Sequence, residues 1–156
     1  MNIQTIKSGI MASIAIIGTI ISKALGGWDS AMQTLIIIMA IDFITGLMVA
    51  GIWKKSPKSC EGALDSRSSF KGLCKKGMIL VFVLIAVRLD IAFSLDNIIR
   101  TAVILFFIGN EGISVVENAG LMGLPLPTQF KKMFEQLKDN NDTAVDAAID
   151  KLEPRE

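Results

Sequence analysis

The fold is decided by a stretch that runs from Ala31 to Trp53 and reads AMQTLIIIMAIDFITGLMVAGIW. A helix rises about 1.5 Å per residue, so about 20 apolar residues cross the hydrocarbon core of a bilayer. One charged residue, Asp42, lies near the middle of this stretch. A carboxylate at that depth costs at least about 2.5–3.5 kcal/mol, so we expect Asp42 to face protein or water and to have a partner.

The composition is that of a membrane protein. The chain has 156 residues, of which 51% are hydrophobic, and its mean hydropathy is +0.53. This length leaves room for three or four spans in one small integral domain. The net charge of +1 does not indicate a nucleic-acid partner. With no histidine, no paired-cysteine motif and no glycine-rich phosphate loop, we expect neither an enzyme nor a metal or cofactor site. Cys60 and Cys74 are predicted to be free thiols.

The N-terminal apolar segment predicts a span at about 8–25. An alternative is a cleavable signal peptide, because the segment has a basic start and small residues near its end. Small side chains recur along it at steps of four and three, which places them on one face of a helix. Such a face lets helices approach closely, either within one chain or between subunits. It comprises Ser8, Ala12, Ala15, Thr19, Ser22 and Gly26.

A basic loop is predicted at 54–76, after the second span at 31–53. Positive charge in a short loop keeps it in the cytoplasm, which also places the N-terminus there. Contact with anionic lipid headgroups explains these charges as well. The basic residues are Lys54, Lys55, Lys58, Arg67, Lys71, Lys75 and Lys76.

Two further spans are predicted at 77–95 and 98–116, and both carry charges. Arg88 and Asp90 are two residues apart and therefore point to nearly opposite sides of a helix. We expect Arg88 or Arg100 to pair with Asp42 or with another carboxylate of the bundle. Glu111 lies at the polar end of the last span. An alternative is a partly inserted hairpin after Val87, which leaves three true spans.

The chain after the last span turns polar. Glycines and prolines at 120–127 end the helix. In the soluble charged tail, 128–156, Phe130, Met133, Phe134 and Leu137 follow a helical spacing and predict an amphipathic cytoplasmic helix. The fold class is thus an all-α integral membrane protein, a bundle of four spans (alternatively three) within residues 1–127.

Three stretches together resemble the toxin-secretion and phage-lysis holin family. They are IDFITGLMVAG (41–51), FKGLCKKGMIL (70–80) with Asp90 beyond it, and GNEGISVVENAGLMGLPLP (109–127). The last stretch carries the most specific part of the resemblance. Its motif residues are Asn110, Glu111, Gly112, Ser114, Glu117, Asn118, Gly120, Gly123, Pro125 and Pro127.

The resemblance implies a holin of the bacterial cytoplasmic membrane. Such a protein oligomerises with copies of itself into lesions that release a muralytic enzyme (an endolysin) or a large toxin. Two other classes stay open from the residues alone. One is a small transporter or channel subunit that uses Asp42 as an ion or proton site. The other is a scaffold that anchors partners through its amphipathic tail. The size of the species that crosses the membrane distinguishes these classes.

Overall fold

The computed structural model describes residues 2–56 and 66–136, which form helices and turns without any strand. The helices are α1 (Ile3–Ala24), α2 (Ser30–Met48), α3 (Ser66–Ala92) and α4 (Ile98–Leu121). A π-helical turn, η1 (Val49–Trp53), extends α2, and residues 128–136 are also helical. Some of the sequence-based predictions concern residues outside the described ranges, namely Lys58, Cys60, Leu137 and the acidic end of the tail.

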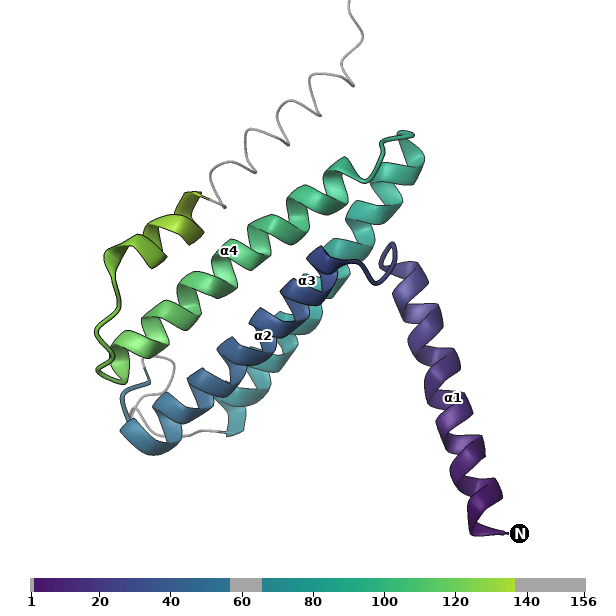
Figure 1. Ribbon diagram of the computed structural model, residues 1–156, viewed down its shortest axis with the longest axis horizontal. Helices are drawn as coiled ribbons and strands as arrows, with labels where there is room; N and C mark the ends of the chain where they lie inside the picture. Colours follow the sequence, from purple (N-terminus) through teal and green to yellow (C-terminus); the bar gives the residue numbers. More distant parts are fainter. Residues whose placement is uncertain (1, 57–65, 137–156) are drawn as a thin grey trace, which may run out of the picture.

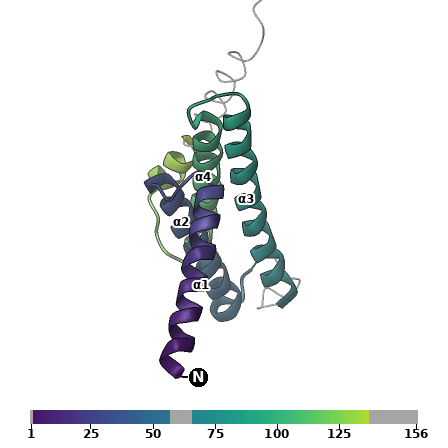
Figure 2. The same cartoon turned by 90° about the vertical axis from the view of Figure 1, so that its right-hand side faces the viewer.

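Helices α2, α3 and α4 lie side by side, whereas α1 meets them only at its C-terminal end and then diverges (Figure 1). A view turned by 90° shows α3 along one flank of α4 (Figure 2). Helix α4 packs against both α2 and α3, and α2 and α3 touch each other less. No residue of α1 is buried. The bundle is therefore made of three helices, and α1 stands apart from it.

The turn between α1 and α2 is set by local hydrogen bonds. Helix α1 ends in a Schellman motif, in which the amide of Gly27 donates to the carbonyl of Ser22 (2.9 Å). Gly26 has a φ of +82°, a left-handed conformation that glycine adopts at no steric cost. Asp29 then caps α2 by accepting a hydrogen bond from the amide of Met32 (2.8 Å). The chain reverses direction within a few residues.

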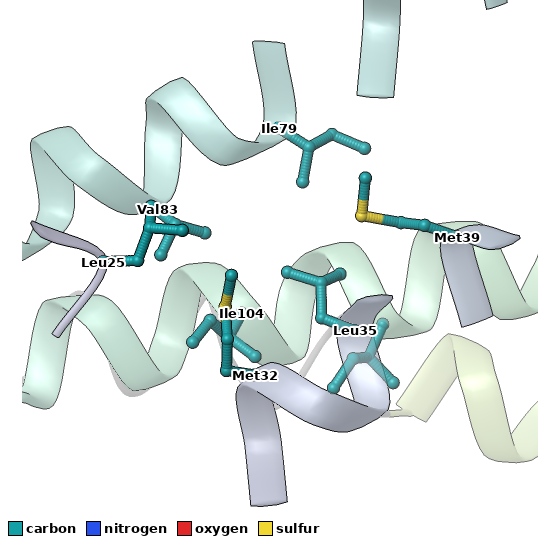
Figure 3. Close-up of a cluster of buried hydrophobic side chains, with 8 residues drawn as sticks. Leu25, Met32, Leu35, Met39, Ile79, Val83 and Ile104 are labelled. Carbon is teal, nitrogen blue, oxygen red and sulfur yellow. The ribbon is translucent and has the colours of Figure 1, made fainter. Parts of the chain in front are cut away.

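The apolar core of the bundle is a compact cluster from all three helices and from Leu25 in the turn before α2 (Figure 3). Within a bilayer, contacts of this kind stabilise a bundle by close van der Waals packing more than by exclusion of water. Each helix contributes residues at helical spacings of three or four. The cluster comprises Leu25, Met32, Leu35, Met39, Ile79, Val83, Ile104 and Ile108.

Helix α3 begins earlier than the charge pattern predicts. Its first residue is Ser66, within the stretch 54–76 that we expected to be a loop, and it ends at Ala92 instead of 95. The boundary needs this correction because lysine and arginine are good helix formers. Lys71 and Lys75 are exposed on the outer surface of the helix, where they do not oppose its formation.

Three helical segments are long and apolar enough to cross a membrane: Ile3–Ala24, Ser30–Trp53 and Ile98–Leu121. Helix α3 is not among them. Its apolar part is too short, because it is preceded by Lys75 and Lys76 and followed by Arg88 and Asp90. Helix α4 also extends past the predicted end at 116 and includes most of the polar motif.

Candidate functional site

Three charged side chains meet inside the bundle, one from each helix. The ammonium group of Lys76 in α3 donates to Asp42 Oδ2 of α2 at 2.8 Å and also to Glu111 Oε2 of α4. The exposed fractions of the three side chains are only 12%, 10% and 9%, respectively. We call these residues the central triad. It joins all three helices of the bundle at about the middle of α2.

Asn118 holds the Asp42 carboxylate from another side. Its side-chain amide donates to Asp42 Oδ1 at 3.1 Å and to the hydroxyl oxygen of Thr45 at 3.0 Å. The Thr45 hydroxyl donates in turn to the Asp42 backbone carbonyl, one turn back along α2. Both oxygens of Asp42 thus accept hydrogen bonds from other helices, which is the state a buried carboxylate needs. The orientation of α4 against α2 is fixed at this point.

A cavity of about 260 Å³ adjoins the central triad. It is roomy and polar enough for several water molecules. Its lining includes Ser56, Ser68 and Ser69, which lie at the end of the bundle that carries the basic stretch. Lys75 lines it as well and is exposed. The triad is therefore buried in protein and lies beside a polar space.

Arg100 forms a second buried polar centre, at the opposite end of the bundle. Its guanidinium donates to the carbonyls of Leu25 (2.7 Å) and Gly27 (3.2 Å) and to the Asp29 carboxylate (2.5 Å). A Cβ on Gly26 would lie 2.6 Å from Arg100 Nε, so this position requires glycine. Arg100 thereby fastens the turn between α1 and α2 to the first turn of α4.

Asp90 caps helix α4 from a neighbouring helix. Asn97 precedes α4 in a left-handed conformation, with a φ of 56°, and its side chain makes no capping bond. The Asp90 carboxylate accepts hydrogen bonds from the amides of Ile99 (2.9 Å) and Arg100 (2.8 Å) instead. These amides are two of the unsatisfied donors at a helix start, where negative charge is also favoured.

The Arg100 contact changes the acidity of Asp29, which lies outside the membrane-spanning segments. The hydrogen bond from Arg100 lowers the pKa of the Asp29 carboxyl below its ordinary value, and this effect outweighs the opposing effect of partial burial. The side chain is 48% exposed, so water screens the pair. Asp29 is accordingly ionised at neutral pH and adds a modest stabilisation to the turn.

The five charged residues that were predicted to lie in the membrane differ in their burial. Asp42, Asp90, Arg100 and Glu111 are buried, whereas Arg88 is exposed. We expected Arg88 or Arg100 to pair with Asp42 or with another carboxylate of the bundle, and in the structure the partner of Asp42 is Lys76. Arg100 does find a carboxylate, but it is that of Asp29 in the turn.

Lys76 is the functional candidate that sequence reasoning misjudged, since it was grouped with the basic loop. A signal was present: Ile79 and Val83 follow it at steps of three and four, so the lysine shares their buried face. Its neighbours in the predicted set are exposed, although three of them lie on α3 and not in a loop. They are Lys54, Lys55, Arg67, Lys71 and Lys75.

The part of the small-residue face that lies on α1 stands away from the bundle, whereas Gly26, in the turn after α1, lies against Arg100. Ala12, Ala15 and Thr19 are exposed, and the Thr19 hydroxyl donates to the carbonyl of Ala15 in its own helix (2.8 Å). Ser8 is exposed too, and only Ser22, near the bundle, is half-buried. Packing of this face against another helix within the chain is thus not observed among the described residues. Its use between subunits stays a prediction.

The motif 109–127 contributes to both the bundle and the reversal that follows it. Glu111 and Asn118 are buried at the central triad, whereas Asn110 and Glu117 are exposed. A Schellman motif ends α4, with Gly123 left-handed at a φ of +88°. The remaining motif residues lie on α4 or in the turn after it. They are Gly112, Ser114, Gly120, Pro125 and Pro127.

Gly112 is a close contact point for the helical segment 128–136. This segment lies alongside α4 (Figure 1), and a Cβ at Gly112 would overlap the ring of Phe134. Phe130 and Met133 of the predicted apolar stripe are exposed. The described residues contain no group of three His, Cys, Asp or Glu side chains that could hold a metal ion.

Comparison with known proteins gives a consistent result. The chain matches the bacteriophage holin family over residues 19–139. An uncharacterized 14.9 kDa protein from the nagH 3′ region of Clostridium perfringens is 38% identical over 140 residues, which cover 88% of this chain and 96% of the relative. A probable holin of Bacillus phage phi105 is 28% identical over 111 residues, or 71% of this chain and 76% of the relative. No solved structure matches the chain significantly.

Proposed function

This chain belongs to the bacteriophage holin family, and from that premise we propose that it assembles with copies of itself in the cytoplasmic membrane into lesions that pass proteins. The match over residues 19–139, together with the similarity to a probable phage holin, is the observation that carries the proposal. The cargo is a peptidoglycan-degrading enzyme or a large toxin. No catalysis is involved, and no direct contact with the cargo is required.

In the proposed topology α3 crosses the membrane in addition to α1, α2 and α4. The chain then has four spans, and both termini lie in the cytoplasm. The charges of α3 support this, because two of them have partners inside the bundle. Lys76 pairs with two carboxylates, and Asp90 caps α4. Arg88 is exposed, but it lies only one turn from the end of α3. From there its long side chain can reach the interface between membrane and water. The basic stretch favours the cytoplasmic side for the opposite end.

Helix α1 supports self-association. It is 22 residues long, it is apolar enough to cross the membrane, and none of its residues is buried. A small-residue face promotes close helix packing in lipid, and a second copy of the chain supplies a helix of matching shape. Bulky replacements at Ala15 or Thr19 should therefore change the oligomer size and the timing of lysis. Unchanged crosslinking ladders together with unchanged timing would count against this face.

The proposal is tested by expression of the full chain in a bacterium that also contains a cytosolic reporter enzyme. A holin should leave growth normal at first and then release the folded reporter abruptly. Collapse of ion gradients while the reporter is retained would favour the alternative, a small channel or transporter subunit with Asp42 as its ion or proton site. Intact cells at high membrane abundance of the protein would argue against both functions.

A further inference from the structure

The central triad has an unbalanced charge. Two carboxylates, Asp42 and Glu111, share one ammonium group, that of Lys76, so the fully ionised triad carries one negative charge. Asp42 is the one charged residue of α2 and η1. The other charged residue that lines the adjoining cavity, Lys75 of α3, is exposed, and so is Glu117 of α4. On the helical segment beside α4, the charged residues are exposed as well: Lys131, Lys132 and Glu135.

This imbalance is unfavourable where the triad lies. The three side chains are about nine-tenths buried, and in the proposed topology they lie at membrane depth. An uncompensated charge in such a place is costly, and two carboxylates held close together favour uptake of a proton by one of them. One proton bound to a carboxylate oxygen makes the triad neutral.

We infer that Asp42 and Glu111 together bind one exchangeable proton in the closed bundle, in addition to the protons of Lys76. The proton moves between a carboxylate oxygen and water, and no other bond forms or breaks. The cavity of about 260 Å³ beside the triad provides the route. Ser56 and Ser68 in its lining lie toward the end of the bundle with the basic stretch, which the proposed topology assigns to the cytoplasm.

Loss of this proton weakens the bundle. The negative charge it leaves is shared by carboxylates on α2 and α4, the two helices that Asn118 joins through Asp42. The closed form binds one proton more than an opened form whose carboxylates reach water, so raising the pH favours opening. The ratio of the two forms changes by at most about tenfold per pH unit. The consequence for lysis rests on the proposed holin function, whereas the proton site itself does not.

Infrared difference spectroscopy of the full chain in lipid vesicles tests the site directly. The expected signal at neutral pH is the carbonyl stretch of a protonated carboxylic acid, which disappears when the pH is raised. Asp42→Asn or Glu111→Gln should remove it, and Glu117→Gln, which changes an exposed carboxylate of the same helix, should leave it intact. Absence of the band in the wild type, or its persistence in both triad variants, would overturn the inference.

A second experiment connects the site with lysis. A permeant weak base that raises the cytoplasmic pH should advance lysis by the wild type, and Glu111→Gln, whose triad is neutral without the extra proton, should not respond. A pH-sensitive band in a protein that never lyses cells would refute the holin proposal and leave the proton site standing. Lysis without such a band would refute the proton site alone.

Discussion

Replacement of Lys76 by methionine is the perturbation that tests the central triad most sharply. Methionine keeps an unbranched chain of similar length but has no charge. It leaves Asp42 and Glu111 buried and facing each other without the ammonium group that now separates them. Lys75 is the matched control, because it is the preceding residue of the same helix and its side chain is exposed.

The expected magnitude follows from burial. Removal of one partner from a buried ion pair costs about 3–5 kcal/mol, because the remaining charge keeps its desolvation penalty. Lys76→Met should lower the free energy of unfolding by that amount. Lys75→Met should change it by no more than about 0.5 kcal/mol, as exposed substitutions usually do. The two neighbouring lysines therefore differ by several kcal/mol in this account.

Equilibrium unfolding of the full-length variants in one detergent provides the assay. A second substitution, Asp42→Asn, should restore part of the loss in the Lys76→Met background, because it removes one of the two unpaired carboxylates. Equal stabilities for Lys76→Met and Lys75→Met would show that Lys76 does not stabilise the buried carboxylates. A double variant less stable than Lys76→Met alone would show that the carboxylates do not depend on this lysine.

Two further predictions concern packing and pH. Gly112→Ala should destabilise the protein by about 1–3 kcal/mol or expose the segment that carries Phe134 to protease, because the new methyl group overlaps the ring. Gly120→Ala, where a Cβ meets open space in the same helix, should instead stabilise it by up to about 1 kcal/mol, and unfolding curves that match for the two variants would contradict this contrast. Acid should weaken the Asp29–Arg100 pair: because its pKa is lowered on folding, Asp29 contributes stability above its ordinary pKa of about 4, and this contribution is lost as the pH falls through the lowered value. The effect should stay below about 1 kcal/mol, since the carboxylate is half exposed, and an acid unfolding profile unchanged in Asp29→Asn would rule it out.

The helices themselves could be predicted from the sequence, because apolar runs and their spacing are local properties. The need of Asp42 for a partner could also be predicted, since it follows from its depth in an apolar stretch. The identity of the partner could not. It depends on how α2, α3 and α4 are rotated and shifted against one another, and many apolar side chains allow several such arrangements. The spacing of three residues between Lys76 and the buried Ile79 was the local indication that Lys76 faces the bundle.

Asp90 and Arg88 illustrate the same limit. Their spacing of two residues predicts that they point to opposite sides of α3, and one is buried while the other is exposed. Asp90 faces inward because the amides of Ile99 and Arg100 at the start of α4 need acceptors, which its carboxylate provides. That requirement arises only when the turn between the helices is formed. Sequence spacing alone contains no information about it.

Release of cargo from lipid vesicles shows directly whether this chain forms lesions that pass folded protein. Vesicles that hold both a small dye and a folded enzyme are prepared with increasing amounts of the purified full-length protein. Both cargoes should escape together once the protein exceeds a threshold density. Release of the dye alone at every density, or retention of both cargoes, would contradict it.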